Sequence, residues 1–185
     1  IYTDTVPGGE EAEYDQDAMD ILLQSREKIL GFWEGSSLPI PQRLAVVLLY
    51  GHKVQNWLDF GEEAAPCQEE ALALLAQLEA SGSWELLLSF FAGLEILTPQ
   101  WSNRLKHPDM SATWNEGQIP LLKYLLRRHW LQAVSDYDLI SRVKLMVISC
   151  LTIRALGGNF VSTAQLYSKE IENSAENVEA ILDAT

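Results

Sequence analysis

The stretch SDYDLISRVKLMVISCLTIRALGG, residues 135–158, decides the fold of this chain. Over Leu139–Leu156, 12 of the 18 residues are apolar, so a helix here would carry apolar surface almost all the way round. Such a helix must be buried on nearly every side, and the sequence therefore predicts a core helix over residues 138–156. The run stops well short of the ~20 apolar residues of a membrane span, because it contains Arg142, Lys144 and Arg154.

Both ends of this predicted helix carry recognisable signals. Ser135, with Asp138 three residues later, resembles a capping box, and the carboxylates of Asp136 and Asp138 would lie at the positive end of the helix dipole. Gly157 and Gly158 follow the last apolar residue and are expected to supply a left-handed cap.

The composition is that of a folded domain with an uneven distribution of charge. Of 185 residues, 48% are hydrophobic and 21% charged, which is typical of a globular protein. The net charge of -13 argues against a general nucleic-acid binder, which neutralises phosphates with Lys and Arg. Residues 101–154 hold 8 of the 13 basic and 4 of the 26 acidic residues. Such a basic middle indicates either the polar stripes of two core helices or a docking site for an acidic ligand or segment.

Apolar spacing, with Pro and Gly at the boundaries, predicts further helices on both sides of the central one. Gly51 falls inside one of them and is expected to permit the close approach of another helix. No alternating strand pattern appears, so we expect an all-α fold, a compact multi-helix bundle of about seven or eight helices around the buried helix 138–156. The segments with helical spacing are 15–34, 42–60, 67–81, 84–98, 100–106, 118–134, 161–173 and 175–182.

The amino-terminal residues differ from the rest. Residues 1–13 contain Pro7-Gly8-Gly9 and several Glu residues, and we expect a mobile acidic lead-in followed by a single helical domain over residues 14–185. The start is acidic and has no apolar core, unlike a signal peptide, and it lacks an initiator Met. We therefore expect the chain to be a segment of a longer protein.

Several kinds of chemistry have no motif in this sequence. There is no Gly-rich loop after a strand, as dinucleotide and phosphate sites require. His52, His107 and His129 have no partner at the spacing of metal ligands. Cys67 and Cys150 are too few for a disulfide framework, a zinc site or an iron-sulfur pattern.

Three clusters of polar residues are candidates for a site. Tyr124 and Arg128 share a helix face, where Arg128 could clamp a carboxylate or pair with an acid such as Asp136. Asp136 and Asp138 could bind a basic group, although capping a helix explains them sufficiently. A third cluster, for which a solvated face with internal ion pairs is the simplest interpretation, comprises Tyr167, Lys169, Glu170 and Glu172.

Two blocks of the chain resemble the carboxy-terminal half of the flagellin lysine-N-methylase family. They are YLLRRHWLQAVSDYDLISRVKLMVISCLTIRAL (residues 124–156) and AQLYSKEIENSAENVEAILDA (residues 164–184), and YDQDAMDILLQSREKIL (14–30) and GLEILTPQW (93–101) fit the same region. The positions that match the family's blocks, to which the resemblance gives no catalytic role, are Tyr124, Arg128, Asp136, Asp138, Lys144, Gln165, Tyr167, Ser168, Lys169, Glu170, Glu172 and Asn177.

The resemblance implies an activity for the whole protein. It would methylate lysines of flagellin with S-adenosylmethionine in the cytoplasm, and its amino-terminal half would carry a cysteine-rich segment holding an iron-sulfur cluster. That segment is missing from these residues. The implied partners are therefore flagellin and the amino-terminal half, with no nucleic acid and no membrane span.

On this resemblance we expect the chain to hold flagellin or to complete the methyl-donor pocket. Glu170 or Glu172 could orient the lysine amine before it loses its proton. The alternative is a non-catalytic helical interaction module, or a scaffold for the amino-terminal half. The candidate site residues are Tyr124, Arg128, Tyr167, Glu170 and Glu172.

Overall fold

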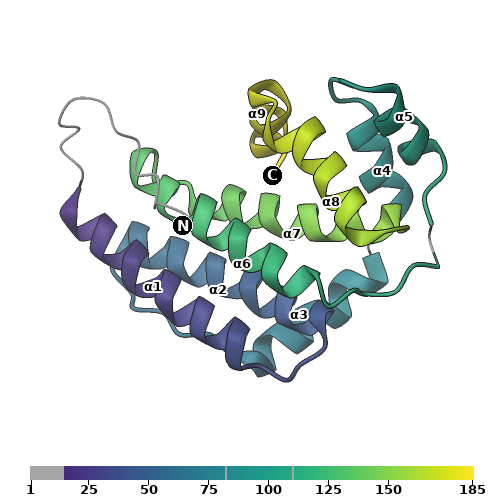
Figure 1. Ribbon diagram of the computed structural model, residues 1–185. Helices are drawn as coiled ribbons and strands as arrows, with labels where there is room; N and C mark the ends of the chain where they lie inside the picture. The colour runs from purple at the N-terminus through teal and green to yellow at the C-terminus, as the bar shows by residue number, and fades with distance from the viewer. Residues whose placement is uncertain (1–14, 82, 110) are drawn as a thin grey trace.

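The architecture is all-α in the computed structural model, which describes residues 15–81, 83–109 and 111–185 (Figure 1). Its nine α-helices in this part of the chain exceed the expected seven or eight, and no strand occurs among these residues. In chain order they are α1 (Gln16–Gly35), α2 (Ile40–Phe60), α3 (Gln68–Ser81), α4 (Trp84–Ala92), α5 (Pro99–Lys106), α6 (Gln118–His129), α7 (Leu139–Leu156), α8 (Phe160–Tyr167) and α9 (Ala175–Ala184). The predicted lead-in over residues 1–13 lies outside the described residues.

Helix α7 runs through the middle of the molecule, as the sequence predicts. In Figure 1, α1, α2 and α3 lie below it, and α4, α5, α8 and α9 lie above it. Of its 18 residues, 13 are buried, which confirms the prediction of a helix covered on nearly every side. Its side chains contribute to two apolar cores, one around Trp33, Tyr50 and Trp130, the other around Phe91, Trp101 and Tyr167. The helix therefore joins the two halves of the bundle.

The amino-terminal cap of α7 differs from the predicted capping box. The side chain of Asp138 accepts a hydrogen bond from the Ser141 backbone N–H at 3.1 Å, so Asp138 itself is the cap. Ser135 instead ends a 3-10 helix, η1 (Trp130–Ser135), and its hydroxyl donates to the Gln132 carbonyl at 2.8 Å. The cap is thus displaced by three residues because the 3-10 turn occupies the preceding stretch.

Gly51 has the role that the sequence predicts for it, whereas Gly157 ends α7 with a positive φ but a ψ of -153°, outside the left-handed helical region that was predicted. A Cβ on Gly51 of α2 would lie 2.8 Å from the Cγ atoms of Val143, so α2 and α7 approach closely only because this side chain is absent. Gly157 ends α7 with φ of 62°, where a Cβ would also lie 2.5 Å from Asp109 Cβ. Any other residue would be strained at Gly157 and would also meet the loop that packs there.

Three predicted helix boundaries differ from those in the structure. The helix expected over 84–98 ends at Ala92, and Gly93 closes its last turn. The helix expected over 118–134 changes to η1 at Trp130, whose indole Nε1 donates to Ser25 Oγ at 3.0 Å. The helix expected over 161–173 changes to a π-helix, η2 (Ser168–Glu172). In the described residues, no helix is long and apolar enough to cross a membrane.

Candidate functional site

A cavity of about 520 Å³ opens where the end of α6, η1, the start of α7 and helix α9 meet, and we name it the Arg128 cavity. Its charged lining comes from segments that are far apart in the sequence. The lining residues with ionisable side chains are Arg128, His129, Asp136, Asp138, Arg142, Glu172, Glu179 and Asp183. Two of the predicted site residues, Arg128 and Glu172, therefore line one cavity.

The predicted pair of Tyr124 and Arg128 is present. Arg128 Nη1 donates to the Tyr124 hydroxyl at 2.5 Å, and the guanidinium lies 5.9 Å from the centre of the Tyr124 ring. One helical turn separates the two residues, so α6 itself brings them together. This contact fixes one edge of the Arg128 guanidinium. The Arg128 side chain remains 37% exposed at the cavity.

Glu172 lies opposite Arg128, and its position is unusual for a carboxylate. Its side chain is only 7% exposed, and Oε1 is 4.0 Å from Arg128 Nε. That distance is too long for a hydrogen bond, and Oε1 is buried without a hydrogen-bond partner in the part of the chain that the structure describes. A buried carboxylate oxygen without a donor is costly, so this atom is suited to a donor from a bound molecule.

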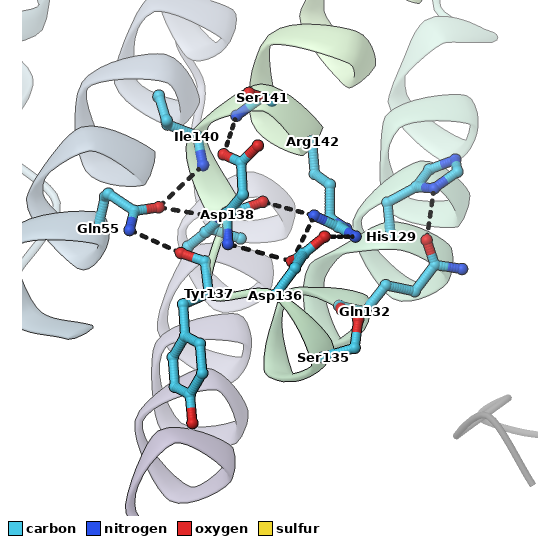
Figure 2. Close-up of polar contacts among 11 residues, drawn as sticks. Gln55, His129, Gln132, Ser135, Asp136, Tyr137, Asp138, Ile140, Ser141 and Arg142 are labelled. Carbon is cyan, nitrogen blue, oxygen red and sulfur yellow. Dashed lines mark hydrogen bonds and ion pairs between the residues drawn. The ribbon is translucent and has the colours of Figure 1, made fainter. Parts of the chain in front are cut away.

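The acid expected to pair with Arg128, Asp136, pairs with Arg142 instead (Figure 2). Arg142 Nη1 donates to Asp136 Oδ1 at 2.9 Å and Nη2 donates to Oδ2 at 2.7 Å, which is a bidentate pair. Arg142 Nη1 also donates to the Asp138 carbonyl at 2.6 Å. Asp136 and Asp138 are therefore occupied in ordering the start of α7, which agrees with the capping interpretation of Asp138.

His129 is neutral in this cavity at pH 7. Burial, with smaller contributions from Arg128 and Arg142, lowers its pKa to about 4, although its hydrogen bond with Gln132 acts in the opposite direction. Its Nδ1 lies 3.2 Å from Gln132 Oε1, an oxygen that accepts a hydrogen bond from the tautomer protonated at Nδ1 (Figure 2). A histidine with this pKa is a weak base and adds no positive charge to the cavity.

Gln55 and Tyr137 support the cavity wall, and sequence reasoning missed both. Gln55 Oε1 accepts from the backbone N–H groups of Leu139 and Ile140, at 2.8 and 3.2 Å, and its Nε2 donates to the Tyr137 carbonyl at 2.7 Å (Figure 2). Tyr137 has a positive φ of 61°, and its hydroxyl donates to Asp15 Oδ2 at 3.1 Å. Gln55 lies on α2, more than 80 residues away, so no local spacing could have indicated it.

Tyr167 lies apart from the cavity, in the second apolar core. It is 1% exposed, its ring contacts Phe91 and Trp101, and its hydroxyl is 2.8 Å from Ser149 Oγ. Burial, together with Glu172 nearby, raises the pKa of Tyr167 above its ordinary value, although the hydrogen bond with Ser149 lowers it. Tyr167 therefore holds the core together and offers no group to a ligand in this structure.

Glu170 is also enclosed and takes part in a clamp on the segment after α4. Its carboxylate accepts from the Leu97 N–H at 2.8 Å and from the Thr98 hydroxyl. Asn177 continues the clamp: its Nδ2 donates to the carbonyls of Glu95 and Glu170, and its Oδ1 accepts from the Glu95 N–H. Glu170 has 0% exposure, so the motif positions Glu170 and Asn177 act on the fold.

The remaining motif positions do not gather at the cavity. Lys144 Nζ donates to the carbonyl of Thr185. Gln165 and Lys169 are exposed, and Ser168 is half-buried in η2. Of the five predicted site residues, the structure thus brings together Tyr124, Arg128 and Glu172, and it places the other two elsewhere.

The Arg128 cavity is acidic on balance. Among the described residues it is lined by five acidic side chains and two arginines, and one of those arginines is held by Asp136. A cationic group would therefore be attracted to it more strongly than an anionic one.

S-adenosylmethionine would need an aromatic or apolar wall for its adenine and an acid for its ribose hydroxyls. Among the described residues, the Arg128 cavity is lined by acids and by the apolar side chains of Ala175, Val178 and Leu182, but by no Phe, Tyr or Trp. A second cavity, between α2, α3, α4 and α7, has Trp84 and Trp114 in its wall, yet no described acidic side chain lines it. Neither of these two cavities therefore combines a Phe, Tyr or Trp ring for the adenine with an acid for the ribose, so the methyl donor fits each of them poorly.

An iron-sulfur cluster does not fit these residues either. Cys150 is fully buried on α7, and burial raises the pKa of its thiol to about 12, so it remains protonated. Within residues 15–81, 83–109 and 111–185, no group of three or more His, Cys, Asp or Glu side chains could hold a metal ion. The cluster expected from the resemblance would have to be held by another part of the protein.

Comparison with protein-family models, with curated proteins and with solved structures finds no match to this chain. The resemblance to the flagellin lysine-N-methylases therefore stays a prediction from the two sequence blocks.

Proposed function

We propose that this chain is the helical substrate-holding domain of a cytoplasmic protein that resembles flagellin lysine-N-methylase. In this proposal the Arg128 cavity receives a lysine side chain of flagellin. S-adenosylmethionine and the iron-sulfur cluster bind to the amino-terminal half, because both cavities fit the methyl donor poorly and no group of described side chains could hold a metal ion. The two sequence blocks, residues 124–156 and 164–184, support the choice of family.

The observation that carries this proposal is the buried Oε1 atom of Glu172, which has no hydrogen-bond partner among the described residues and belongs to a residue in the acidic lining of the cavity. A lysine ammonium would supply the missing donor and a compensating charge. Glu172 would orient the amine, and Arg128, held by Tyr124, would keep the carboxylate from turning away. Methyl transfer requires a neutral, positioned amine, so the proton must leave after binding.

Titration of the chain with labelled flagellin tests this proposal. We expect saturable binding, with a dissociation constant on the order of tens of micromolar, as for a weak enzyme–substrate contact. Glu172→Gln should weaken it by about 10–100-fold, the equivalent of one charge-assisted hydrogen bond. Glu62→Gln is the matched control, because it removes the same charge at an exposed residue outside the cavity. Flagellin with chemically acetylated lysines should not bind.

Binding that is equally strong for acetylated flagellin and for Glu172→Gln would contradict the lysine-holding role. Circular dichroism of the Glu172→Gln variant shows whether the fold is retained, so that a loss of binding is attributed to the cavity.

The alternative, a non-catalytic interaction module or scaffold, is favoured by a different observation. Apolar side chains are exposed on α4 and just after it, at Leu86, Phe90, Ile96 and Leu97. They would suit an interface with the amino-terminal half. The full-length protein, incubated with S-adenosylmethionine and flagellin, separates the two functions. Methylation that Glu172→Gln abolishes favours the enzyme, and an absence of methylation with intact flagellin binding favours the module.

A further inference from the structure

The second cavity, about 600 Å³ in volume, differs from the first in having a mainly apolar wall. Leucines of α2 and α3 and the indoles of Trp84 and Trp114 form most of it, and α7 supplies the rest. Its volume lies in the range of ordinary small-molecule sites, roughly 300–1,000 Å³. We name it the Arg154 cavity after the residue at one of its ends.

The face of α7 that lines this cavity has a basic residue at each end. Val147, Ile148 and Leu151 lie between Lys144 and Arg154, and all five lie on one side of the helix. Ten residues separate the two basic positions, which corresponds to about 15 Å along the helix axis. The cavity is therefore an elongated apolar space with a cationic group at either end.

The two cations are not equivalent. Lys144 Nζ already donates to the Thr185 carbonyl. The Arg154 guanidinium lies 4.8 Å from the centre of the Trp84 ring, but no carboxylate of the described chain pairs with it. Its Nε is buried and has no hydrogen-bond partner among the described residues. A half-buried guanidinium with an unmet donor, at the end of an apolar cavity, is suited to an anionic group on an apolar molecule.

We propose that the Arg154 cavity binds an aliphatic monocarboxylate, with the carboxylate on Arg154 and the hydrocarbon chain along the apolar face of α7. The walls come from four helices, so the occupant is enclosed on several sides. A narrow hydrocarbon chain fits such a space better than a partner helix, whose diameter with side chains is about 10 Å. The Trp84 ring, stacked on the guanidinium, keeps it from turning into solvent. This site is separate from the Arg128 cavity and does not depend on the proposed methylase function.

The test is a calorimetric titration of the whole chain with sodium dodecanoate, kept below its micelle concentration. We expect one saturable site, and dodecanol, which has the chain without the charge, should bind about tenfold more weakly or worse. Arg154→Gln should weaken dodecanoate binding by a similar factor. Arg127→Gln, an exposed arginine of α6 outside both cavities, should leave it unchanged.

A variant that fills the cavity, Leu151→Trp, should abolish binding while circular dichroism shows an intact helical fold. No saturable binding to the wild type, equal affinity for dodecanol and dodecanoate, or an unchanged affinity in Arg154→Gln would overturn the proposal. Displacement of dodecanoate by S-adenosylmethionine would overturn it in favour of a donor site. Binding of an acidic amphipathic peptide, with none of dodecanoate, would overturn it in favour of a protein-docking groove.

Discussion

Burial keeps His129 in its neutral form at the end of α6, and this has a consequence for stability at low pH. Burial is the main reason that its pKa falls from 6.5 to about 4, and the charges of Arg128 and Arg142 act in the same direction. Below pH ~6.5 the unfolded chain binds a proton that the folded chain refuses. The stability contributed by a neutral His129 is therefore present at pH 7 and is lost as the pH falls towards 4.

We predict that His129→Gln removes this part of the pH dependence. Between pH 7 and pH 4.5 the free energy of unfolding of the wild type should fall by about 2–3 kcal/mol more than that of the variant. Urea unfolding at both pH values measures the two differences. His107→Gln, which changes an exposed histidine, should follow the wild type. If the free energy of unfolding falls by the same amount in the wild type and in His129→Gln, then His129 takes up its proton in the folded protein.

Among single residues, sequence reasoning succeeded where the contact is local. Tyr124 and Arg128 lie one helical turn apart, and their contact follows from the helix itself. The partner of Arg128 was wrongly expected to be Asp136, because Arg142 approaches Asp136 with better bidentate geometry. Charged side chains in a helical stretch are usually solvated, so only tertiary packing could reveal that Glu170 is fully enclosed.

Among the elements, α2 holds the start of α7 through a single side chain. Gln55 accepts hydrogen bonds from two backbone N–H groups in the first turn of α7. These two groups have no hydrogen-bond partner within the helix itself. Its amide also donates to the carbonyl of Tyr137, whose positive φ is unfavourable for an aromatic residue. One amide therefore caps a helix and fixes the strained residue before it.

We predict that Gln55→Ala lowers the free energy of unfolding by about 1–2 kcal/mol, because two partly buried backbone N–H groups and one exposed carbonyl lose their partner. Chemical denaturation of the variant measures the loss. Gln100→Ala, at an exposed position of α5, should cost far less. If the two substitutions cost the same, water replaces the Gln55 amide at the start of α7.

The clamp formed by Asn177 of α9 gives a second prediction for the elements. Asn177→Ala removes three hydrogen bonds that tie Glu95 and Glu170 together, and it should cost about 2–4 kcal/mol. The Glu95 amide should also exchange its hydrogen faster in the variant. Asn173→Ala, at an exposed position, is the matched control. Unchanged exchange at Glu95 would mean that other contacts hold this segment.

The same clamp explains why the end of α4 could not be predicted. Residues 84–98 have helical spacing, but hydrogen bonds of Glu95 to Asn177 and of Leu97 and Thr98 to Glu170, more than 70 residues later, favour a non-helical backbone there. Helix identity follows from local periodicity, which is why α1, α2, α3, α5 and α7 occur where the sequence predicts them. Helix ends depend on partners that local patterns do not reveal.

At the scale of the whole molecule, α7 is shared by the two apolar cores. Leu126 of α6 is fully buried in the first core, and Ile181 of α9 is fully buried in the second. Neither core keeps its packing without α7, whose side chains complete both. The described part of the chain is therefore expected to unfold as one cooperative unit.

We predict that Leu126→Ala and Ile181→Ala, each costing about 2–5 kcal/mol, shift one common unfolding transition. Tryptophan fluorescence reports on both cores, through Trp33 and Trp130 in the first and Trp101 in the second, and far-ultraviolet circular dichroism reports on all helices. Both signals should give the same urea midpoint in the wild type and in each variant. A plateau in Ile181→Ala with part of the helical signal retained would contradict this prediction, because it would mean that the first core and α7 remain folded after the second core has opened.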